Sequence, residues 1–409
     1  LLAYFLVPLK DDKASKATPS VSPSPDRWAK LPADWKAWQT TVYATAERGV
    51  KEAPKRTESG GSNAQPACVE GDGSVFCSGN SVLPVRVDVT TGRILWRARV
   101  LPKGTPVDRY NSSPLGVRDR AFLVAEGVMN AAGNDTDSRV AAYDIDTGKR
   151  LWSRPFQSGL ADTTVVGEVV ILPDGGSVTA RDPRTGDESW TATQPTGYNC
   201  QYRADGTALY ADCTNYHTAS GTDRVLFTVD LIDGKTGRLR SAPSVNAAFA
   251  GTLDDGKLVY VEQHSDDRTF TRIDLIDPTA DTVRVITLAE PQQGTPAIVH
   301  GVLCFATSSG RVTGVSPLTG VRRWQTATTL ERPGAPVPDT LRSLFLTTPS
   351  GRVAALDAWS GKLLWETPPR AAEVEYFGGS SEPPLLTEGA LTISTPDGTL
   401  FSLDPANPS

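Results

Sequence analysis

The sequence is poor in the residues that most often carry catalysis and metal binding. It contains three histidines, one methionine and five cysteines among 409 residues. No Cys-x-x-Cys pair occurs, which excludes the common zinc-binding and thioredoxin-type motifs. The motifs of hydrolase nucleophiles (Gly-x-Ser-x-Gly), of zinc proteases (His-Glu-x-x-His) and of phosphate-binding loops are also missing. His217, His264 and His300 are far apart in the chain, and we expect them to be solvated or hydrogen-bonded. We therefore predict no catalytic residue and no metal site.

Positive charge is not in excess either. The 41 lysines and arginines are outnumbered by 47 aspartates and glutamates, which gives a net charge of −6. The basic residues do not cluster, whereas a nucleic-acid binder needs a positive stripe that neutralises phosphates. Nucleic acid is therefore excluded as a partner.

The N-terminus has the order of a membrane tether. Residues 1–9 are apolar, but a bilayer requires about 20 such residues, so this stretch alone is too short to span it. Because Leu1 is not an initiator methionine, we interpret residues 1–10 as the C-terminal end of a truncated transmembrane helix. The alternative is an apolar stretch in an unstructured terminus. Residues 11–27 predict a Pro/Ser-rich linker, and a globular body follows over 28–409.

One phrase recurs from residue 88 onward. It consists of an aspartate, a glycine four residues later and a tryptophan four residues after that. The full copies contain Asp88, Gly92 and Trp96; Asp144, Gly148 and Trp152; Asp182, Gly186 and Trp190; and Asp357, Gly361 and Trp365. Another copy has Ser316 before Gly320 and Trp324. Two copies are degraded, at Asp233–Ser241 (with Gly237) and Asp277–Val285, and an eighth begins at Asp404. From Asp88 to Asp404 the period is about 45 residues, which is typical of propellers and solenoids.

The chemistry of the phrase indicates a strand, a turn and a second strand. The aspartate accepts backbone N–H bonds in an Asx-type turn, and the glycine supplies the positive φ that the turn needs. Because five of the nine tryptophans stand at the same position, we interpret them as packing between neighbouring repeats. Inner strands of eight repeats are expected near Pro66, Pro114, Thr163, Asn199, Phe249, Pro296, Pro338 and Pro384.

The last repeat lacks its final strand, because the chain stops soon after Asp404. Residues 34–43 form a tryptophan-bearing strand candidate without a repeat of its own. We predict that this segment supplies the missing outer strand and closes a ring, since an open ring would expose a sheet edge. The alternative is a short surface helix.

Two pairs of cysteines flank predicted hairpins. If Val69 pairs with Phe76, Cys68 lies opposite Cys77, and a turn at Asp205-Gly206 places Cys200 opposite Cys213. Cross-strand neighbours are within disulfide reach. We predict the disulfides Cys68–Cys77 and Cys200–Cys213 and an oxidising compartment, the alternative being four unrelated buried thiols. Cys304 lies in an apolar strand and is expected to be an inert thiol.

The pattern Ala-x-Asp-x-x-Thr-Gly-x-x-x-Trp resembles the repeat of pyrroloquinoline-quinone-type (PQQ-like) β-propellers, over about residues 60–409. The resemblance implies an all-β, eight-bladed propeller of four-stranded antiparallel blades around a central channel. Quinoprotein alcohol dehydrogenases share this fold, but they have an adjacent cysteine pair that is missing here, and their calcium-binding set has no counterpart that we can place. We therefore expect no cofactor, with pyrroloquinoline quinone as the alternative.

Two further relatives suggest roles without catalysis. The outer-membrane assembly propeller is a periplasmic scaffold with similar repeats. Extracytoplasmic propellers of actinobacterial membrane proteins, some of them receptor Ser/Thr kinases, match the order of tether, linker and propeller best. We therefore expect a membrane-tethered, extracytoplasmic propeller that senses a ligand or interacts with a protein. A quinoprotein dehydrogenase and an envelope-assembly scaffold are the alternatives.

A ligand or partner is expected at the mouth of the channel. Residues just before or at the start of the predicted inner strands should crowd there, and their polar, aromatic and acidic side chains suit a small polar ligand or a peptide. These candidates are Tyr110, Asn111, Ser112, Asp162, Tyr198, Asn199, Gln293, Thr295 and Glu382. The alternative for each residue is a solvated loop position.

Overall fold

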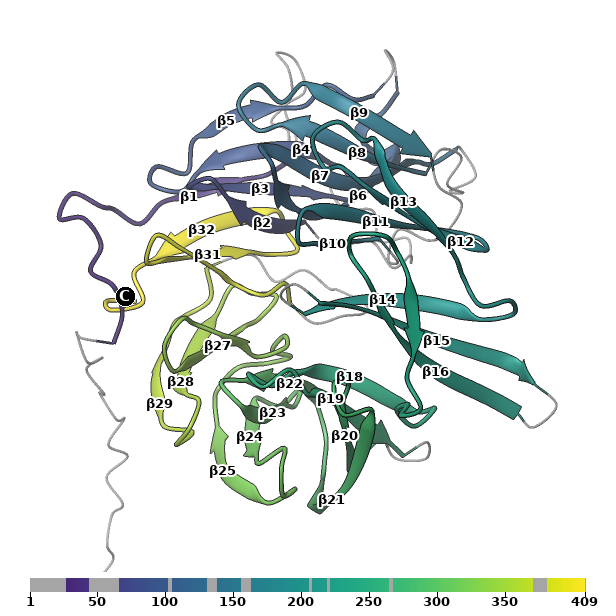
Figure 1. Ribbon diagram of the computed structural model, residues 1–409. Coiled ribbons are helices and arrows are strands. Elements are labelled where there is room, and N and C mark those ends of the chain that lie inside the picture. The colour runs from purple at the N-terminus through teal and green to yellow at the C-terminus, as the bar shows by residue number, and fades with distance from the viewer. Residues whose placement is uncertain are drawn as a thin grey trace, which may run out of the picture.

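Eight four-stranded antiparallel sheets form a ring (Figure 1). This computed structural model describes residues 27–43, 66–101, 105–130, 138–155, 163–205, 208–218, 221–264, 268–370 and 381–408. The predicted helix end at 1–10 and nearly all of the predicted linker at 11–27 lie outside these residues. Within the described ranges, no helix combines the length and the apolar character needed to cross a membrane. The prediction of an all-β, eight-bladed propeller is confirmed.

The first four blades follow one another along the chain. Blade 1 contains β2 (Ala67–Gly71), β3 (Ser74–Gly79), β4 (Val82–Asp88) and β5 (Ile94–Arg97). A 3-10 helix, η1 (Val107–Arg109), precedes blade 2, which contains β6 (Tyr110–Arg118), β7 (Ala121–Val128), β8 (Arg139–Asp144) and β9 (Arg150–Pro155). Blade 3 contains β10 (Thr164–Val166), β11 (Val169–Asp174), β12 (Ser177–Arg181) and β13 (Glu188–Thr193). Blade 4 contains β14 (Asn199–Asp205), β15 (Ala208–Thr218), β16 (Gly221–Val229) and β17 (Thr236–Arg238).

The remaining blades complete the ring. Blade 5 contains β18 (Ala247–Thr252), β19 (Leu258–Gln263), β20 (Phe270–Asp277) and β21 (Thr282–Gln292). Blade 6 contains β22 (Thr295–Val299), β23 (Val302–Ala306), β24 (Arg311–Val315) and β25 (Arg322–Ala327). Blade 7 contains β26 (Val337–Pro338), β27 (Ser343–Thr347), β28 (Val353–Asp357) and β29 (Leu363–Glu366). Blade 8 contains β30 (Leu385–Thr387), β31 (Ala390–Ser394), β32 (Thr399–Leu403) and the N-terminal strand β1 (Gln39–Thr41). The inner strands thus begin close to the predicted positions.

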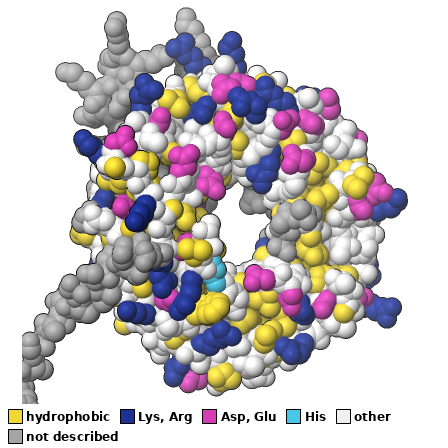
Figure 2. All heavy atoms as spheres, turned by 60° about the vertical axis from the view of Figure 1, so that its left-hand side comes forward, with side chains coloured by type: hydrophobic (Ala, Val, Ile, Leu, Met, Phe, Trp, Pro, Cys, Tyr) yellow, Lys and Arg dark blue, Asp and Glu magenta, His cyan; other side chains and the backbone are white. Residues whose placement is uncertain are grey.

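The hydrophobic core lies between the blades. In blade 7, every residue of β27 and β28 is buried. Both faces of such a sheet are covered by neighbouring blades, so its middle strands are continuous apolar runs rather than alternating ones. Figure 2 shows the ring from one face, with an opening at its centre and with side chains of both charges interspersed over that face.

The repeat aspartate organises its turn as predicted. In blade 1, Asp88 Oδ1 accepts hydrogen bonds from the backbone N–H groups of Thr90 (2.9 Å) and Thr91 (3.0 Å). The backbone N–H of Gly92 donates to the carbonyl of Asp88 at 2.9 Å, and Gly92 has a φ of +68°. The carboxylate and the backbone carbonyl of the aspartate thus both accept hydrogen bonds within the turn between the third and fourth strands.

Four of the five repeat tryptophans pack on the turn of the next blade, whereas Trp365 packs on Trp28 with 6.1 Å between the ring centres. Trp96 Nε1 donates to the carbonyl of Ile145 at 2.7 Å, and its ring covers Gly148, where a Cβ would lie 2.6 Å from the indole. Three equivalent bonds join Trp152 to Pro183 (2.9 Å), Trp190 to Leu231 (2.8 Å) and Trp324 to Ala358 (2.9 Å). The interpretation of these tryptophans as packing between repeats is confirmed.

The N-terminal segment closes the ring as a strand and not as a helix. β1 pairs with β32 in an antiparallel register that sets Gln39 opposite Phe401. Trp38, just before β1, donates from Nε1 to the carbonyl of Val89 at 2.7 Å and covers Gly92. Trp38 is thus the repeat tryptophan of blade 8, although it stands more than 350 residues before Asp404 in the sequence.

The repeat of blade 4 is three residues earlier than the sequence prediction. The turn uses Asp230 and Gly234: the N–H of Gly234 donates to the Asp230 carbonyl at 2.9 Å, and Trp190 covers Gly234. The predicted pair, Asp233 and Gly237, has the same four-residue spacing but lies three residues later in the sequence. Arg238, not Ser241, therefore stands where other blades have tryptophan.

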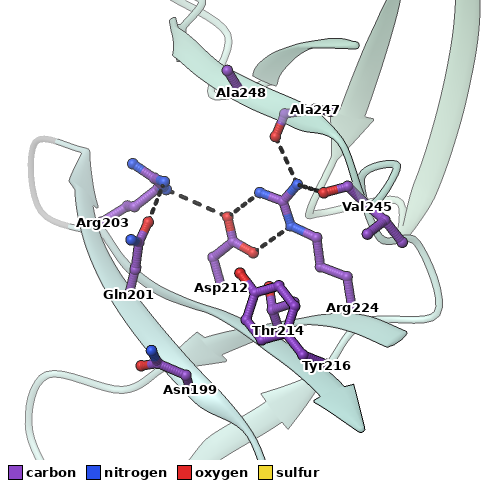
Figure 3. Close-up of a pocket in the computed structure, with 10 residues that line it drawn as sticks. All are labelled: Asn199, Gln201, Arg203, Asp212, Thr214, Tyr216, Arg224, Val245, Ala247 and Ala248. Atoms are coloured by element: carbon purple, nitrogen blue, oxygen red, sulfur yellow. Dashed lines mark hydrogen bonds and ion pairs between the residues drawn. The ribbon is translucent and has the colours of Figure 1, made fainter. Parts of the chain in front are cut away.

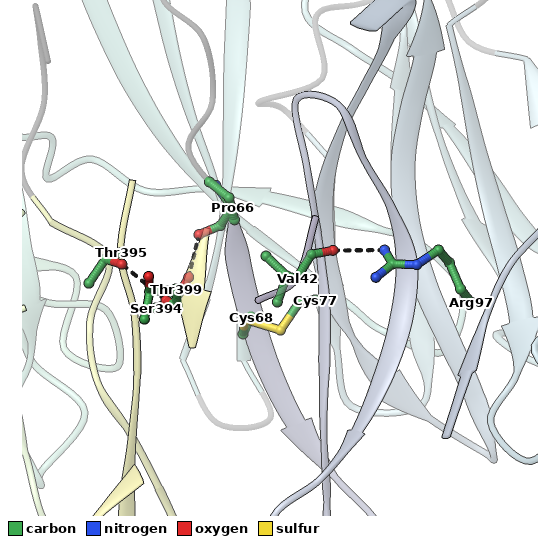
Figure 4. Close-up of a disulfide and its surroundings, with 8 residues drawn as sticks. All are labelled: Val42, Pro66, Cys68, Cys77, Arg97, Ser394, Thr395 and Thr399. Carbon is green, nitrogen blue, oxygen red and sulfur yellow. Dashed lines mark hydrogen bonds between the residues drawn. A yellow bond between two sulfur atoms is a disulfide. The ribbon is translucent and has the colours of Figure 1, made fainter. Parts of the chain in front are cut away.

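Both predicted disulfides are confirmed. Cys68–Cys77 joins β2 to β3 with 4.1 Å between Cα atoms, and Cys200–Cys213 joins β14 to β15 with 3.9 Å. Figure 4 shows the first disulfide near Pro66, whose carbonyl accepts a hydrogen bond from Ser394 Oγ of blade 8 at 2.8 Å. Cys304 is a free thiol, and its burial raises its pKa to about 12.

Candidate functional site

The junction between blades 4 and 5 departs from the repeat. Because Arg238 replaces the tryptophan, no indole covers the next turn. Asp281 occupies the glycine position of that turn, with a φ of +51°, and its carboxylate accepts hydrogen bonds from the N–H groups of Arg240 (2.8 Å) and Ser241 (3.1 Å). Polar contacts thus replace the usual apolar packing between the two blades.

The same junction encloses a polar pocket of about 280 Å³ at the other end of the strands (Figure 3). Blade 4 supplies side chains from β14, β15 and β16, and blade 5 supplies residues at the start of β18. The pocket is lined by Asn199, Gln201, Arg203, Asp212, Thr214, Tyr216, Arg224, Val245, Ala247 and Ala248. Asn199 begins β14 and Tyr216 lies near the end of β15, so the pocket lies opposite the aspartate turns.

A buried ion pair forms the back of the pocket. Arg224 donates from Nε and Nη2 to the two carboxylate oxygens of Asp212, at 2.8 and 2.6 Å, and both side chains are at least nine-tenths buried. Nη1 of Arg224 donates across the junction to the carbonyls of Ser244 (2.8 Å) and Ala247 (2.7 Å). Although burial alone would lower the pKa of Arg224, the hydrogen bond and charge of Asp212 outweigh it and raise this pKa. The pair therefore anchors blade 5 to blade 4.

A second arginine lies at the side of the pocket. Arg203 donates from Nη2 to Gln201 Oε1 at 2.8 Å, and its Nε lies 3.4 Å from Asp212 Oδ2. Its guanidinium stacks 5.0 Å from the ring centre of Phe249, and its side chain is 28% exposed. Tyr260 donates to the same carboxylate at 3.3 Å. Arg203 is thus held in position while it remains accessible from the pocket.

One of the predicted rim residues, Asn199, lines this pocket. The adjacent Tyr198 packs instead with residues of blades 3 and 4 and donates from its hydroxyl to Asp223 Oδ2 at 2.5 Å. Gln293 lines a second polar pocket of about 330 Å³ between blades 5 and 6, together with Glu290 and Arg322. Thr295 begins β22, which belongs to blade 6.

The other predicted rim residues lie in separate blades. Tyr110 and Ser112 are buried in blade 2, where Tyr110 donates to Glu126 Oε2 at 2.6 Å and Ser112 donates to the carbonyl of Gly79 at 3.1 Å. Asn111 lies between them on β6. The carbonyl of Glu382 accepts a hydrogen bond from Thr347 Oγ1 at 2.8 Å, next to blade 8. Asp162 lies outside the described residues.

The sequence analysis missed the three charged residues that define the pocket: Arg203, Asp212 and Arg224. Each lies inside a strand, where a charged side chain is expected to point to solvent. A signal was present, because Asp212 stands between the apolar Ala211 and the disulfide-bonded Cys213, where a charge needs a partner.

The side chains that could bind a metal ion do not cluster in the described part of the chain. His300 Nε2 lies 3.2 Å from both Asp339 Oδ1 and the carbonyl of Ser343. Across the described ranges, no group of three or more His, Cys, Asp and Glu side chains is placed to hold a metal ion.

Comparison with known proteins agrees with the fold and with the repeat. A family described as outer membrane protein assembly factor BamB matches residues 32–279, 217–342 and 331–408. A quinoprotein ethanol dehydrogenase of Pseudomonas putida is 27% identical over 143 residues. That match covers 29% of this chain and 21% of the dehydrogenase, so the chain spans about a fifth of the length of this relative.

Solved structures show the same propeller at low sequence identity. BamB of Moraxella catarrhalis is 14% identical, with a TM-score of 0.51, over 82% of this chain and 95% of that one. The quinohemoprotein alcohol dehydrogenase of Comamonas testosteroni is 12% identical, with a TM-score of 0.57, over 92% of this chain and 78% of that one. At such identities the likeness concerns the fold alone.

Proposed function

Because the chain belongs to the family described as outer membrane protein assembly factor BamB, we propose that it is a non-catalytic propeller that binds a small polar ligand or a protein partner. The observation that carries this proposal is the junction of blades 4 and 5. Five of the other seven junctions are closed by a tryptophan on a turn. Here, as between blades 5 and 6, the tryptophan is lost, and the other end of the same junction encloses a pocket of about 280 Å³ with a buried ion pair in its wall. Departures from a local rule are expected at functional sites.

We also propose that the propeller is held outside the cytoplasm at the cell membrane. Two disulfides suit an oxidising compartment. Arg27 donates to Asp357 in the aspartate turn of blade 7 at 2.9 Å, so the N-terminal end of the described residues lies at the ends of the strands opposite to the pocket.

The proposed role extends to sensing within a larger membrane protein. If a kinase domain precedes Leu1, the propeller is the sensor half of a Ser/Thr receptor kinase. The coding sequence upstream of Leu1 tests this directly: a glycine-rich loop and a His-Arg-Asp catalytic loop support it, and a start codon within a few dozen residues contradicts it.

A quinoprotein dehydrogenase and an envelope-assembly scaffold are the alternative functions. The first is favoured by the dehydrogenase match of 27% over 143 residues, and the second by the family description. Calorimetric titration with pyrroloquinoline quinone and Ca²⁺, followed by a dye-linked alcohol oxidation assay, distinguishes a dehydrogenase from a non-catalytic propeller. Micromolar binding of the quinone together with alcohol oxidation would refute our proposal and identify the chain as a dehydrogenase.

Ligand binding itself is tested by native mass spectrometry. The protein is incubated with a small-molecule and peptide extract of the culture medium and is compared with an Ala248→Trp variant, whose larger side chain fills the pocket. We expect a bound compound on the unmodified protein and loss of that compound from the variant. An extract that yields no bound compound, or one that binds both proteins equally, contradicts the proposal.

A further inference from the structure

We propose that the pocket between blades 4 and 5 recognises an anionic group, a carboxylate or a phosphate, through the guanidinium of Arg203. This inference rests on the proposed binding role of the same pocket and specifies the chemistry of its ligand. It follows from the hydrogen-bonding capacity that the lining residues have left and from their charges.

The only carboxylate among the lining residues is buried and already paired. Asp212 Oδ2 accepts from Arg224 Nη2 and Tyr260 and is approached by Arg203 Nε, and Oδ1 accepts from Arg224 Nε. Because the charge of this carboxylate is matched by Arg224 and its side chain is only 2% exposed, it offers little to a cationic ligand.

The neutral side chains of the pocket supply donors beside Arg203. Gln201 uses its Oε1 to accept from Arg203, which leaves its amide NH₂ for other partners. Thr214 and Tyr216 contribute hydroxyls, and Asn199 contributes a second amide, and each of these groups can donate as well as accept. Together with the guanidinium of Arg203 they can surround the oxygens of a carboxylate or a phosphate.

Charge favours the same class of ligand. The lining residues include two arginines and one aspartate, and the charge of Arg224 is matched by its bidentate pair with Asp212. Arg203 is then the cation in excess, and apart from the longer approach to Asp212 its bonds are to a neutral amide. On the blade 5 side, Arg272 is paired with Glu262 at 2.8 Å and with Asp274 at 3.3 Å, and neither acid lines the pocket. An anion on Arg203 would complete the local balance.

The position of Arg203 suits this task. Its stacking on Phe249 and its bond to Gln201 fix the plane of the guanidinium before a ligand arrives. A planar guanidinium held in this way can donate two parallel hydrogen bonds to one anionic group. Pre-organisation of this kind reduces the entropy lost on binding.

Calorimetric titration of the whole chain tests the inference with simple probes. The probes are succinate, glycerol 3-phosphate and the neutral analogue succinamide, each at constant ionic strength. We expect at least one of the two anions to bind and succinamide not to bind. Stronger binding of succinate assigns a carboxylate ligand, and stronger binding of glycerol 3-phosphate assigns a phosphate.

Variants of Arg203 link the binding to this side chain. Arg203→Gln should weaken the anion about 10-fold to 100-fold, as expected for loss of a charged hydrogen-bond donor. Arg203→Lys keeps the charge without the planar fork and should bind with intermediate affinity. Arg93→Gln, an exposed site in blade 1, is the matched control and should bind as the unmodified chain does. Circular dichroism confirms that each variant is folded.

Three results would overturn the inference: equal binding of succinate and succinamide, anion binding that Arg203→Gln leaves unchanged, or no binding of either anion. The proposed function fails separately. A neutral compound from the culture extract that the Ala248→Trp variant no longer binds would refute the anionic class and keep the binding role, whereas an extract without any bound compound refutes the binding role as well.

Discussion

The closure of the ring depends on the contact between Trp38 and Gly92, and substitution of Gly92 by alanine tests it. Gly92 has a φ of +68°, and a Cβ there would lie 2.4 Å from Cε3 of Trp38. The left-handed backbone alone costs an alanine about 1 kcal/mol. The indole must also move, which weakens its 2.7 Å bond to the Val89 carbonyl and its packing, at a further cost of about 2–4 kcal/mol. We expect Gly92→Ala to lower the free energy of unfolding by about 3–5 kcal/mol.

Gly175 provides the matched control. It has a φ of +60°, but a Cβ there would meet no atom within 4 Å. Gly175→Ala should therefore cost only about 1 kcal/mol, since it carries the backbone term without the clash. The difference between the two variants isolates the contact with Trp38.

The assay is equilibrium unfolding in guanidinium chloride, followed by circular dichroism. Trp38→Ala removes the indole, and we expect it to cost about 2–4 kcal/mol. In the double variant the alanine at position 92 meets no ring, so its additional cost should fall to about 1 kcal/mol. If Gly92→Ala destabilises the protein no more than Gly175→Ala does, or if the two costs add fully in the double variant, this account of ring closure is wrong.

Three further predictions concern single features of the blades. Replacing Cys68 and Cys77 by serine should lower the free energy of unfolding by about 2–3 kcal/mol, measured by chemical denaturation, because the disulfide closes a loop in the unfolded chain; an unchanged midpoint contradicts this. Burial alone would raise the pKa of Asp357, but hydrogen bonds from the Ser360 backbone and from Arg27 among others hold it well below its usual range. The stability that this lowered pKa contributes is present above about pH 4 and is lost as the pH falls further, so Arg27→Ala should reduce the loss of stability between pH 6 and pH 2.5; an identical pH dependence in the variant refutes the assignment. Cys304, whose pKa burial raises to about 12, should resist iodoacetamide in the native protein at pH 8 and react after denaturation, as peptide mapping will show.

The fold could be predicted because its main determinants are local and repeated. The aspartate, glycine and tryptophan of each phrase satisfy one turn and cover the next, so their spacing reports the blade count directly. The closing strand could be predicted for a related reason: the last repeat lacked a partner, and residues 34–43 carried a tryptophan without a repeat. The repeated phrase is readable within a few residues, and the closing strand follows from matching two incomplete pieces of that phrase at opposite ends of the chain.

The register of blade 4 shows where this reasoning stops. Asp230…Gly234 and Asp233…Gly237 have the same spacing, and the choice between them is made by Trp190 of the preceding blade. That contact is not visible in the sequence. A local signal was nevertheless present, because β16 ends at the apolar Val229 and most other repeat aspartates also directly follow an apolar residue at the end of a strand.

The candidate site was predicted only in part, for the same physical reason. Asn199 was predicted at the mouth of the channel because it begins an inner strand, and the structure places it in this pocket between two blades. Arg203, Asp212 and Arg224 come from three different strands, and their grouping depends on how blade 4 packs against blade 5. A repeat pattern describes what the blades share, whereas this pocket arises where two of them differ.

The central claim is that this propeller binds its ligand at the junction of blades 4 and 5. Hydrogen–deuterium exchange with and without the culture extract that supplies the ligand tests this claim most directly. The account predicts protection confined to β14, β15, β16 and the start of β18. Protection centred on other blades, or on the inner strands all around the channel, would contradict it.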